Sequence, residues 1–321
     1  MKTHPVESPT TMRLPVLKSL LIFSPAKLNL FLDVLYKRPD GYHEILTLFE
    51  RISLSDSIHL TELSSDEIVI SSTSRDIPCN GDNLAYKAAE LLKASQGIKR
   101  GIKIDIEKNI PVCAGLGGGS SNAASVLLGL NKLFGLKLKQ KTLLSYANRL
   151  GSDVAFFILG RKFALGRGRG GDLETLPMPK NAALWHLLFV PRMKVATKDV
   201  YEAFDREKKG MDCPKKPLKS LKLTKKTHDV NILLSHLKRK NILLLNRNIY
   251  NRLSETVMKS YSLVSELKSD LSKYGLKNVH MSGSGPTLFA NFRSRDDAVR
   301  VLEDVRYRLS DRCDMFLAST L

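Results

Sequence analysis

Apolar positions along the first half of the chain follow two periods, two residues in strand-like runs and about 3.6 residues in helix-like runs. Residues 101–107 alternate three isoleucines with charged side chains, as a half-buried strand does. Similar runs predict strands at residues 21–36 (a strand pair or one long bent strand), 46–54, 57–62, 67–72, 163–165 and 184–190. Helical spacing predicts helices that begin at Asp82 as N-cap, after the glycines of 115–119 and near Ser152, and one that spans about 140–150.

From residue 198 onward the pattern is mostly helical. Short strands are expected at 280–282 and 288–292, on either side of a Gly-Ser-Gly-Pro segment, followed by a last helix at 296–309 and a strand at 315–319. The chain is therefore expected to form an α+β protein in which early strands and helices hold the glycine-rich segment and a later region closes over it. The expected division is an extension at 1–20, a first domain at 21–170 and a second at 171–321.

The most informative segment joins the strand at 101–107 to the helix that follows it. It contains Gly115, the run Gly117, Gly118 and Gly119, and then two serines. Glycine lets the backbone approach a ligand closely, and the first turn of a helix offers unpaired N–H groups and partial positive charge. These features predict a phosphate site. A serine-capped helix after a flexible loop is the alternative, but it does not explain three consecutive glycines.

Two common kinds of phosphate loop are excluded. A Walker A loop ends in Gly-Lys-Ser/Thr, and no lysine follows Gly119 until Lys132. The dinucleotide-binding spacing G-x-G-x-x-G fails from Gly115, because the sixth residue is a serine. The same spacing does occur at 166–171, but the segment 172–177 that follows it ends in a proline and predicts no helix.

The composition narrows the class of partner. The 321 residues carry a formal net charge of +19, which favours anionic partners, and no apolar run is long enough to cross a bilayer. Much of the excess lies between residues 206 and 240, where no ladder of aromatic residues is interleaved, so nucleic-acid binding is not expected. The four cysteines are far apart, which predicts reduced thiols in a reducing compartment.

Phosphoryl transfer needs a cation near the transferred group and a carboxylate near the acceptor hydroxyl. Lys27 lies in an apolar strand, where it is either functional or a snorkelling lysine at a sheet edge. Asp153 opens an apolar helix, where the residues alone favour a plain N-cap over a functional role. Tyr42 and His43 follow the turn at 38–41, where they either grip a ligand or form a surface turn without function.

Three segments together resemble the signatures of the GHMP kinases, and they occur in the right order. Residues 24–30 (SPAKLNL) resemble the first signature, 111–124 the second and 281–287 (MSGSGPT) the third. The resemblance spans residues 23 to about 293 and implies a two-domain α+β fold with the active site in the cleft between the domains. Residues 21–170 would form the ATP-binding domain and 171–321 the substrate-side domain.

Within this superfamily, SPAKLNLFL, the turn RPDGYH at 38–43 and the triple glycine resemble the family of 4-diphosphocytidyl-2-C-methyl-D-erythritol kinases. That resemblance implies phosphorylation of the 2-hydroxyl of an anionic small molecule that carries a cytidine diphosphate group, with ATP and Mg²⁺, in the non-mevalonate isoprenoid pathway of a bacterial cytoplasm. The alternatives are a mevalonate-type or homoserine-type GHMP kinase and a basic RNA-binding protein on a degenerate kinase fold.

The family resemblance also implies roles for individual residues. Asp153 would accept the hydroxyl proton, and Lys27 would hold that carboxylate ionised, since a nearby cation lowers a carboxyl pKa. The implied substrate contacts are Asn29, Tyr42 and Tyr201 on either side of the cytosine, His43, Thr197, Ser282 and Gly283. The implied ATP contacts are Asn83 and Lys108 near the adenine and Gly115, Leu116, Gly117, Gly118, Gly119, Ser120 and Ser121 at the phosphates, with Ser121 as metal ligand.

The sequence departs from the family pattern in two places. Residues 195–197 read Val-Ala-Thr where the family has Val-Ser-Thr, so one hydroxyl is lost. Residues 246–249 read Asn-Arg-Asn-Ile where Asn-Asp-Leu-Glu is common. The second departure weakens any expectation of substrate contacts at 246–249.

Overall fold

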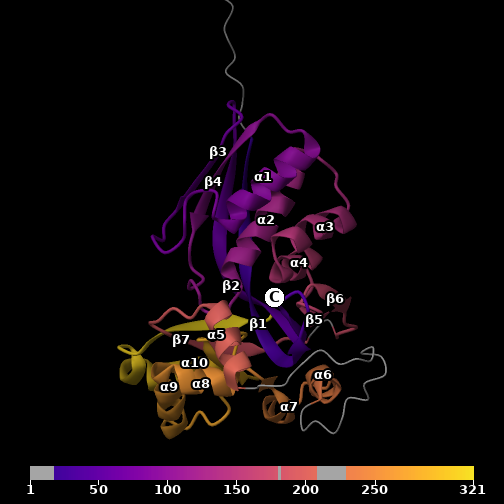
Figure 1. The fold of residues 1–321 in the computed structure, drawn as a ribbon. Coiled ribbons are helices and arrows are strands. Elements are labelled where there is room, and N and C mark those ends of the chain that lie inside the picture. Colours follow the sequence, from indigo (N-terminus) through magenta and orange to yellow (C-terminus); the bar gives the residue numbers. More distant parts are fainter. Residues whose placement is uncertain (1–17, 180–181, 208–228) are drawn as a thin grey trace, which may run out of the picture.

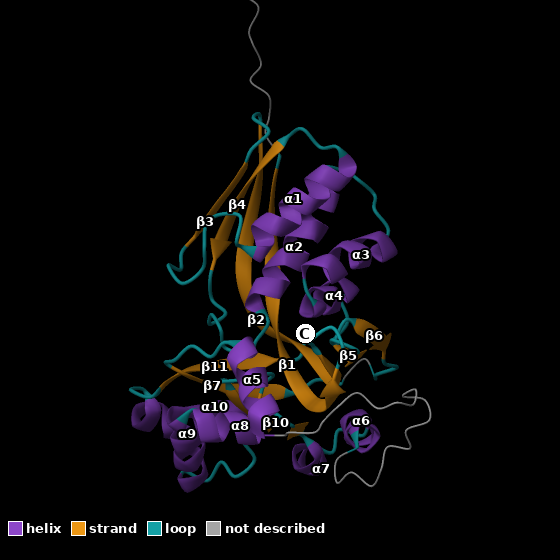
Figure 2. Cartoon of the chain, viewed as in Figure 1, coloured by secondary structure: helices purple, strands orange, loops and turns teal. Residues whose placement is uncertain are grey.

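The computed structural model describes residues 18–179, 182–207 and 229–321, and within these residues the chain forms two β-sheets, each with its own helices (Figures 1 and 2). The first sheet contains β1 (Ser19–Lys37), β2 (His43–Leu63), β3 (Ile68–Ser72), β4 (Gly101–Glu107), β5 (Phe163–Arg167), β6 (Asp172–Thr175) and β8 (Tyr250–Asn251). The helices α1 (Leu84–Gln96), α2 (Gly118–Leu133), α3 (Gln140–Leu150) and α4 (Ser152–Leu159) lie together on one side of it (Figure 1). The α+β expectation is confirmed.

The second sheet has the order β11-β7-β10-β9. Its strands are β7 (Trp185–Pro191), β9 (His280–Met281), β10 (Leu288–Phe292) and β11 (Cys313–Ser319). The helices of this part are α5 (Thr197–Glu207), α6 (Val230–Lys238), α7 (Ile242–Asn248), α8 (Ser254–Ser260), α9 (Ser262–Lys273) and α10 (Arg295–Leu309). The predicted boundary at residue 170 stays a prediction, and both β6 and β8 pair with strands of the first sheet.

Two long antiparallel strands, β1 and β2, form the spine of the first sheet. The sequence predicted two strands at 46–54 and 57–62, and this was wrong, because β2 runs without a break from His43 to Leu63. Three polar residues at 55–57 interrupt the apolar pattern where the two predicted strands were divided. Instead Asp56 is completely buried inside the strand and is stabilised by hydrogen-bond donors from a distant loop.

The helices over the first sheet agree closely with the sequence pattern, apart from one cap. The α3 helix has the predicted bounds, and α4 begins at Ser152 as expected. The N-cap of α1 is Asn83 and not Asp82: the Asn83 side chain accepts a hydrogen bond from the Ala85 N–H at 2.9 Å. Both residue types suit an N-cap, so the sequence did not separate the two neighbours.

A buried polar cluster connects the two sheets. The His186 ring on β7 hydrogen-bonds Glu50 on β2 at 3.0 Å and Asn291 on β10 at 2.8 Å, and both His186 and Glu50 are fully buried. The C-terminal end returns to the same place, since the Leu321 N–H donates to the Arg51 carbonyl at 3.0 Å. Buried polar groups of this kind are costly unless they are paired, so the cluster favours one arrangement of the two sheets.

Candidate active site

A pocket of about 910 Å³ is lined by residues of the first sheet with its helices and loops, and by α5 and the turn at 283–284 from the second part. The site residues predicted from the sequence that line it are Lys27, Asn29, Tyr42, His43, Asn83, Lys108, Gly115, Leu116, Gly117, Gly118, Gly119, Ser120, Asp153, Thr197, Tyr201 and Gly283. Two predicted residues, Ser121 and Ser282, do not line the pocket. The structure thus brings together residues that are up to 256 positions apart, from Lys27 to Gly283.

The glycine-rich segment places a bare helix N-terminus in the pocket. The N-cap of α2 is Gly117, in the left-handed conformation with a φ of 71°, and no side chain caps the helix. The alternative of a serine-capped helix is therefore wrong. The Ser121 N–H bonds the Gly117 carbonyl at 2.9 Å, so the N–H groups of the three residues before it have no acceptor within the helix. These groups are free to hold an anion.

Gly115 lies where the segment meets the Gly-Ser-Gly-Pro turn from the second sheet. It has a φ of +74°, and a Cβ there would lie 2.5 Å from the Ser282 carbonyl oxygen. The Ser282 hydroxyl donates to the Gly115 carbonyl at 3.1 Å, and the Thr287 hydroxyl donates to the Ala114 carbonyl at 2.6 Å. The third signature therefore supports the second directly, and Ser282 is a fully buried support in this structure.

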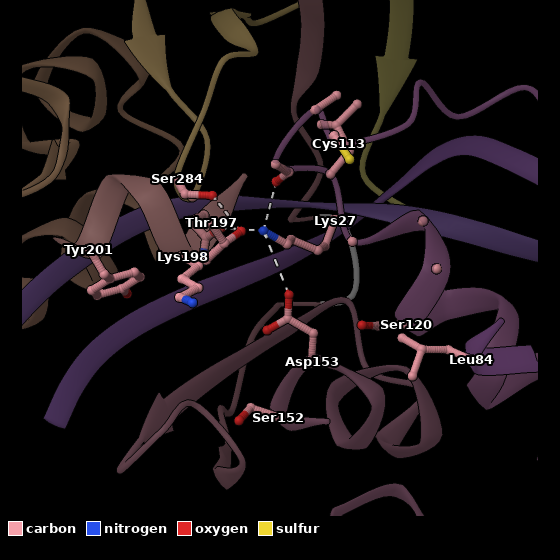
Figure 3. A pocket seen from close by; sticks show the side chains of 18 of the residues that line it. Lys27, Leu84, Cys113, Ser120, Ser152, Asp153, Thr197, Lys198, Tyr201 and Ser284 are labelled. Carbon is pink, nitrogen blue, oxygen red and sulfur yellow. Dashed lines mark hydrogen bonds and ion pairs between the residues drawn. The ribbon is translucent and has the colours of Figure 1, made fainter. Parts of the chain in front are cut away.

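Lys27 reaches the pocket from the middle of β1, with only 4% of its surface exposed. Its ammonium donates to the Asn29 side-chain oxygen at 2.6 Å and to the Gly115 carbonyl at 2.7 Å, and it faces Asp153 Oδ2 at 3.9 Å (Figure 3). The alternative of a snorkelling edge lysine is therefore wrong. Burial lowers the pKa of Lys27, and the negative charge of Asp153 opposes this shift.

Asp153 lies in the first turn of α4, whose N-cap is Gly151, so the alternative of a plain N-cap is wrong. Its side chain is 34% exposed and points into the pocket towards Lys27 (Figure 3). The Lys27 ammonium and Asp153 Oδ2 are 3.9 Å apart, which is too long for a hydrogen bond, so Lys27 constrains the carboxylate only weakly. The carboxylate therefore keeps acceptor capacity for a ligand.

Lys108 lines the pocket next to the glycines, and its position depends on a residue that the sequence analysis missed. Asp56, fully buried on β2, pairs with the Lys108 ammonium. The same carboxylate accepts hydrogen bonds at 2.8 Å from the backbone of Asn109, the backbone of Ile110 and the side chain of Asn122. Asp56 lies between two serines in the sequence, so no local signal marked it as a buried partner of Lys108.

The two serines of the loop have different environments. Ser120 lines the pocket, as Figure 3 shows. Ser121 is fully buried, and its hydroxyl accepts a hydrogen bond from the Ser24 hydroxyl at 2.8 Å. Ser120 therefore presents its hydroxyl to the pocket, while Ser121 connects α2 to β1.

The far end of the pocket carries the aromatic residues. The His43 ring stacks on the Tyr201 ring with a centroid distance of 4.9 Å, and the Arg169 guanidinium lies 3.5 Å from the centroid of the Tyr42 ring. Tyr42 is exposed, but His43 is the first residue of β2 and is buried, so the alternative of a surface turn is wrong for His43. Thr197 belongs to the same end, where its hydroxyl lies 2.9 Å from the Ser284 hydroxyl.

Two further findings concern metals and membranes. Among the residues that the structure describes, no group of three His, Cys, Asp or Glu side chains is arranged to hold a metal ion. Magnesium commonly binds through one or two protein groups together with substrate phosphates, and Asp153 and Ser120 are two residues with oxygen donors that line the pocket. In the same part of the chain, no helix is long and apolar enough to span a membrane.

Known proteins resemble the chain over most of its length. Residues 83–161 match the family described as GHMP kinases N terminal domain, and residues 233–311 match GHMP kinases C terminal. The 4-diphosphocytidyl-2-C-methyl-D-erythritol kinase of Geobacillus kaustophilus is 40% identical over 89% of this chain and 93% of its own.

Solved structures agree with this result. A crystal structure of a 4-(cytidine 5'-diphospho)-2C-methyl-D-erythritol kinase superposes with a TM-score of 0.73 at 34% identity, covering 94% of this chain and 98% of the other. The mevalonate kinase of L. major has a TM-score of 0.72 at 15% identity over 96% of this chain and 98% of its own, and it shares the fold alone. The chain therefore belongs to the 4-diphosphocytidyl-2-C-methyl-D-erythritol kinases, within the GHMP kinase superfamily.

Proposed function

We propose that this chain transfers the γ-phosphoryl group of ATP to the 2-hydroxyl of 4-diphosphocytidyl-2-C-methyl-D-erythritol, a step of the non-mevalonate isoprenoid pathway. The observation that carries this proposal is the pairing of buried Lys27 with partly exposed Asp153, beside the uncapped N-terminus of α2. A cation, a carboxylate with free acceptor capacity and a phosphate cradle are the parts that phosphoryl transfer to an alcohol requires.

Asp153 is proposed to accept the proton of the 2-hydroxyl. The Lys27 ammonium has three N–H donors, of which two are taken by Asn29 and Gly115 and the third faces Asp153. It therefore holds a positive charge at a defined point beside the carboxylate. Phosphoryl transfer depends mostly on positioning and charge stabilisation, which this arrangement provides.

The phosphates of ATP are proposed to lie on the first turn of α2. The N–H groups of Gly118, Gly119 and Ser120 have no acceptor within the helix, and the helix dipole favours an anion there. Lys108 adds a positive charge next to Gly118, since its ammonium lies 3.1 Å from where a Cβ on that glycine would be. Asp153 and the Ser120 hydroxyl are proposed to hold Mg²⁺, which would neutralise charge on the transferred group.

The cytidine end of the substrate is proposed to bind between Tyr42 and Tyr201. Aromatic rings bind a planar base through stacking, and mevalonate and homoserine offer no base. Cationic side chains of Lys37, Arg169 and Lys198 also line this part of the pocket and suit a diphosphate. The aromatic end of the pocket is the feature that favours the cytidine substrate over the acceptors of other GHMP kinases.

The test is ADP release by the purified protein with ATP and Mg²⁺, offering the cytidine compound, mevalonate and homoserine in parallel. We expect turnover with the cytidine compound alone and its loss in the Asp153→Asn variant. Turnover with another alcohol would support the kinase activity but overturn the proposed substrate. Absence of any turnover, together with RNA binding that weakens steeply with salt, would favour the RNA-binding alternative.

A further inference from the structure

One carboxylate connects α5 to the hairpin between β1 and β2. Asp205 Oδ1 lies 2.7 Å from His43 Nε2, and Asp205 Oδ2 lies 2.6 Å from the Lys37 ammonium. Lys37 and His43 are direct cross-strand partners at the base of the hairpin. Both oxygens of one side chain on α5 therefore hold the two strands that carry the turn with Tyr42.

The contacts of His43 extend this connection to the second aromatic residue. The His43 ring stacks on Tyr201 at 4.9 Å with an interplanar angle of 28°. Tyr201 and Asp205 lie four residues apart on α5, so they share one face of the helix. His43 is thus held by two residues of the same helix, and its ring covers one face of the Tyr201 ring, which also lines the pocket.

We propose that Asp205 is a positioning residue for the cytidine group: by binding His43 and Lys37 it fixes the distance between the hairpin that carries Tyr42 and the helix that carries Tyr201. This inference rests on the proposed function. Asp205 acts through its two partners and requires no contact with the base. The Asp205 side chain is 28% exposed and the His43 side chain is 8% exposed. The buried histidine therefore shields their hydrogen bond from water on one side.

The bond also determines where the hydrogen of the imidazole lies. An ionised carboxylate only accepts hydrogen bonds, so Nε2 of His43 carries a hydrogen. Partial burial acts to raise the pKa of Asp205, but the hydrogen bonds from Lys37 and His43 together with the Lys37 charge outweigh it and hold the pKa below its usual value. The carboxylate is therefore ionised at neutral pH.

The test compares three variants of one cluster with a control on the same helix. Asp205→Ala removes both bonds, Asp205→Asn keeps an acceptor for His43 but loses the charge, and Lys37→Ala removes only the lysine. Asp199→Ala is the control, because Asp199 is an exposed acid of α5 that does not line the pocket. The measurements are the KM values for the cytidine substrate and for ATP, and the affinity for cytidine diphosphate by calorimetry.

Asp205→Ala is expected to raise the KM for the cytidine substrate and the Kd for cytidine diphosphate about tenfold to a hundredfold, with the KM for ATP unchanged. Asp205→Asn should retain most of the affinity, Lys37→Ala should show a smaller loss than Asp205→Ala, and Asp199→Ala should match the wild type. In a His43→Ala background, removing Asp205 should have little further effect. Nitrogen NMR of His43 should show Nε2 protonated in the wild type and a mixture of tautomers in Asp205→Ala.

The possible results separate this inference from the proposed function. Equal binding of cytidine diphosphate by the wild type and Asp205→Ala overturns the inference alone. If Asp205→Ala raises the KM for ATP as much as the KM for the cytidine substrate, Asp205 is a general structural residue and the inference is overturned. The same conclusion follows if the variant has a lower melting temperature but an unchanged affinity for cytidine diphosphate. A wild type that does not bind cytidine diphosphate overturns both. A wild type that binds it but does not phosphorylate the cytidine substrate overturns only the proposed reaction, since the calorimetry still tests Asp205.

Discussion

Two lysine–aspartate pairs lie at the glycine-rich loop, and they differ in the environment of the aspartate. In both pairs the lysine side chain is 5% exposed. Asp56 is completely buried and accepts from three further donors besides Lys108. Asp153 is 34% exposed and faces Lys27 at 3.9 Å. The same two residue types therefore form a saturated buried pair on one side of the loop and an open pair on the other.

The difference shows how one pair can support the fold while the other performs chemistry. A carboxylate with all its lone pairs occupied has no capacity to accept a substrate proton, and removing it leaves several buried donors unsatisfied. A carboxylate with one distant cation is available to a ligand and contributes little to stability. Burial and partner number, rather than residue type, distinguish the two roles.

The largest expected effect is the loss of catalysis in Asp153→Asn. A positioned general base contributes about 10²-fold to 10⁴-fold to a rate, so kcat for ADP release should fall by that factor. The free energy of unfolding in denaturant should change by less than about 1 kcal/mol, because the pair is long and partly exposed. A kcat within about threefold of the wild type would show that Asp153 is not the base.

Asp56→Asn should lower the free energy of unfolding much more than Asp153→Asn does. Breaking a buried pair costs about 3–5 kcal/mol, because Lys108 then remains in the interior without its partner. The measurement is the free energy of unfolding in denaturant. Glu62→Gln is the matched control: Glu62 is a buried acid on the same strand whose partner, Arg100, is half exposed, so its loss should cost less. Equal losses in the two variants would contradict the distinction between the pairs.

The third prediction concerns the lysine of the open pair. Burial lowers the pKa of Lys27 below its ordinary value of 10.5, so the folded protein loses this proton at a lower pH than the unfolded chain does. Above the lowered pKa, kcat should fall about tenfold per pH unit, because the charge beside Asp153 is lost. Between the two pKa values the unfolded chain binds more protons, so the contribution of this group to stability rises with pH.

Activity and this part of the stability should therefore change in opposite directions as pH rises. A pH profile of kcat, together with denaturant unfolding of the wild type and Lys27→Met over the same range, measures both trends. The variant should lack the rise in stability. A kcat that stays constant up to pH 10.5 would contradict a lowered Lys27 pKa.

The local sequence pattern was sufficient to predict much of the fold and to identify the residues that belong to short motifs. Strand β4 and helix α3 have the predicted bounds, because alternation and helical spacing are properties of adjacent residues. The glycine segment could be interpreted as a phosphate loop for the same reason. The roles predicted for individual site residues remain predictions.

The missed residues share one property, which is that their partners are distant in the sequence. Asp56 binds Lys108, which is 52 residues away, and Asp205 binds His43 and Lys37, which are 162 and 168 residues away. Asp56 is also the reason why β2 was predicted as two strands. An aspartate is not expected at a buried strand position unless hydrogen-bond donors from elsewhere in the chain surround it. No local spacing identifies a side chain whose environment is supplied by another sheet or helix.

The smallest expected effects come from the two serines of the loop, and they repeat the contrast between the pairs within a single turn of helix. Ser121→Ala removes a buried hydrogen bond with Ser24 and should cost about 1 kcal/mol of unfolding free energy, with the KM for ATP unchanged. Ser120→Ala should leave stability unchanged and raise the KM for ATP or the Mg²⁺ concentration that gives half of the maximal rate, because its hydroxyl faces the pocket. If Ser121→Ala alone changes the magnesium dependence, then Ser121 turns towards the ligand when ATP binds, and the metal contact implied by the family resemblance belongs to the buried serine.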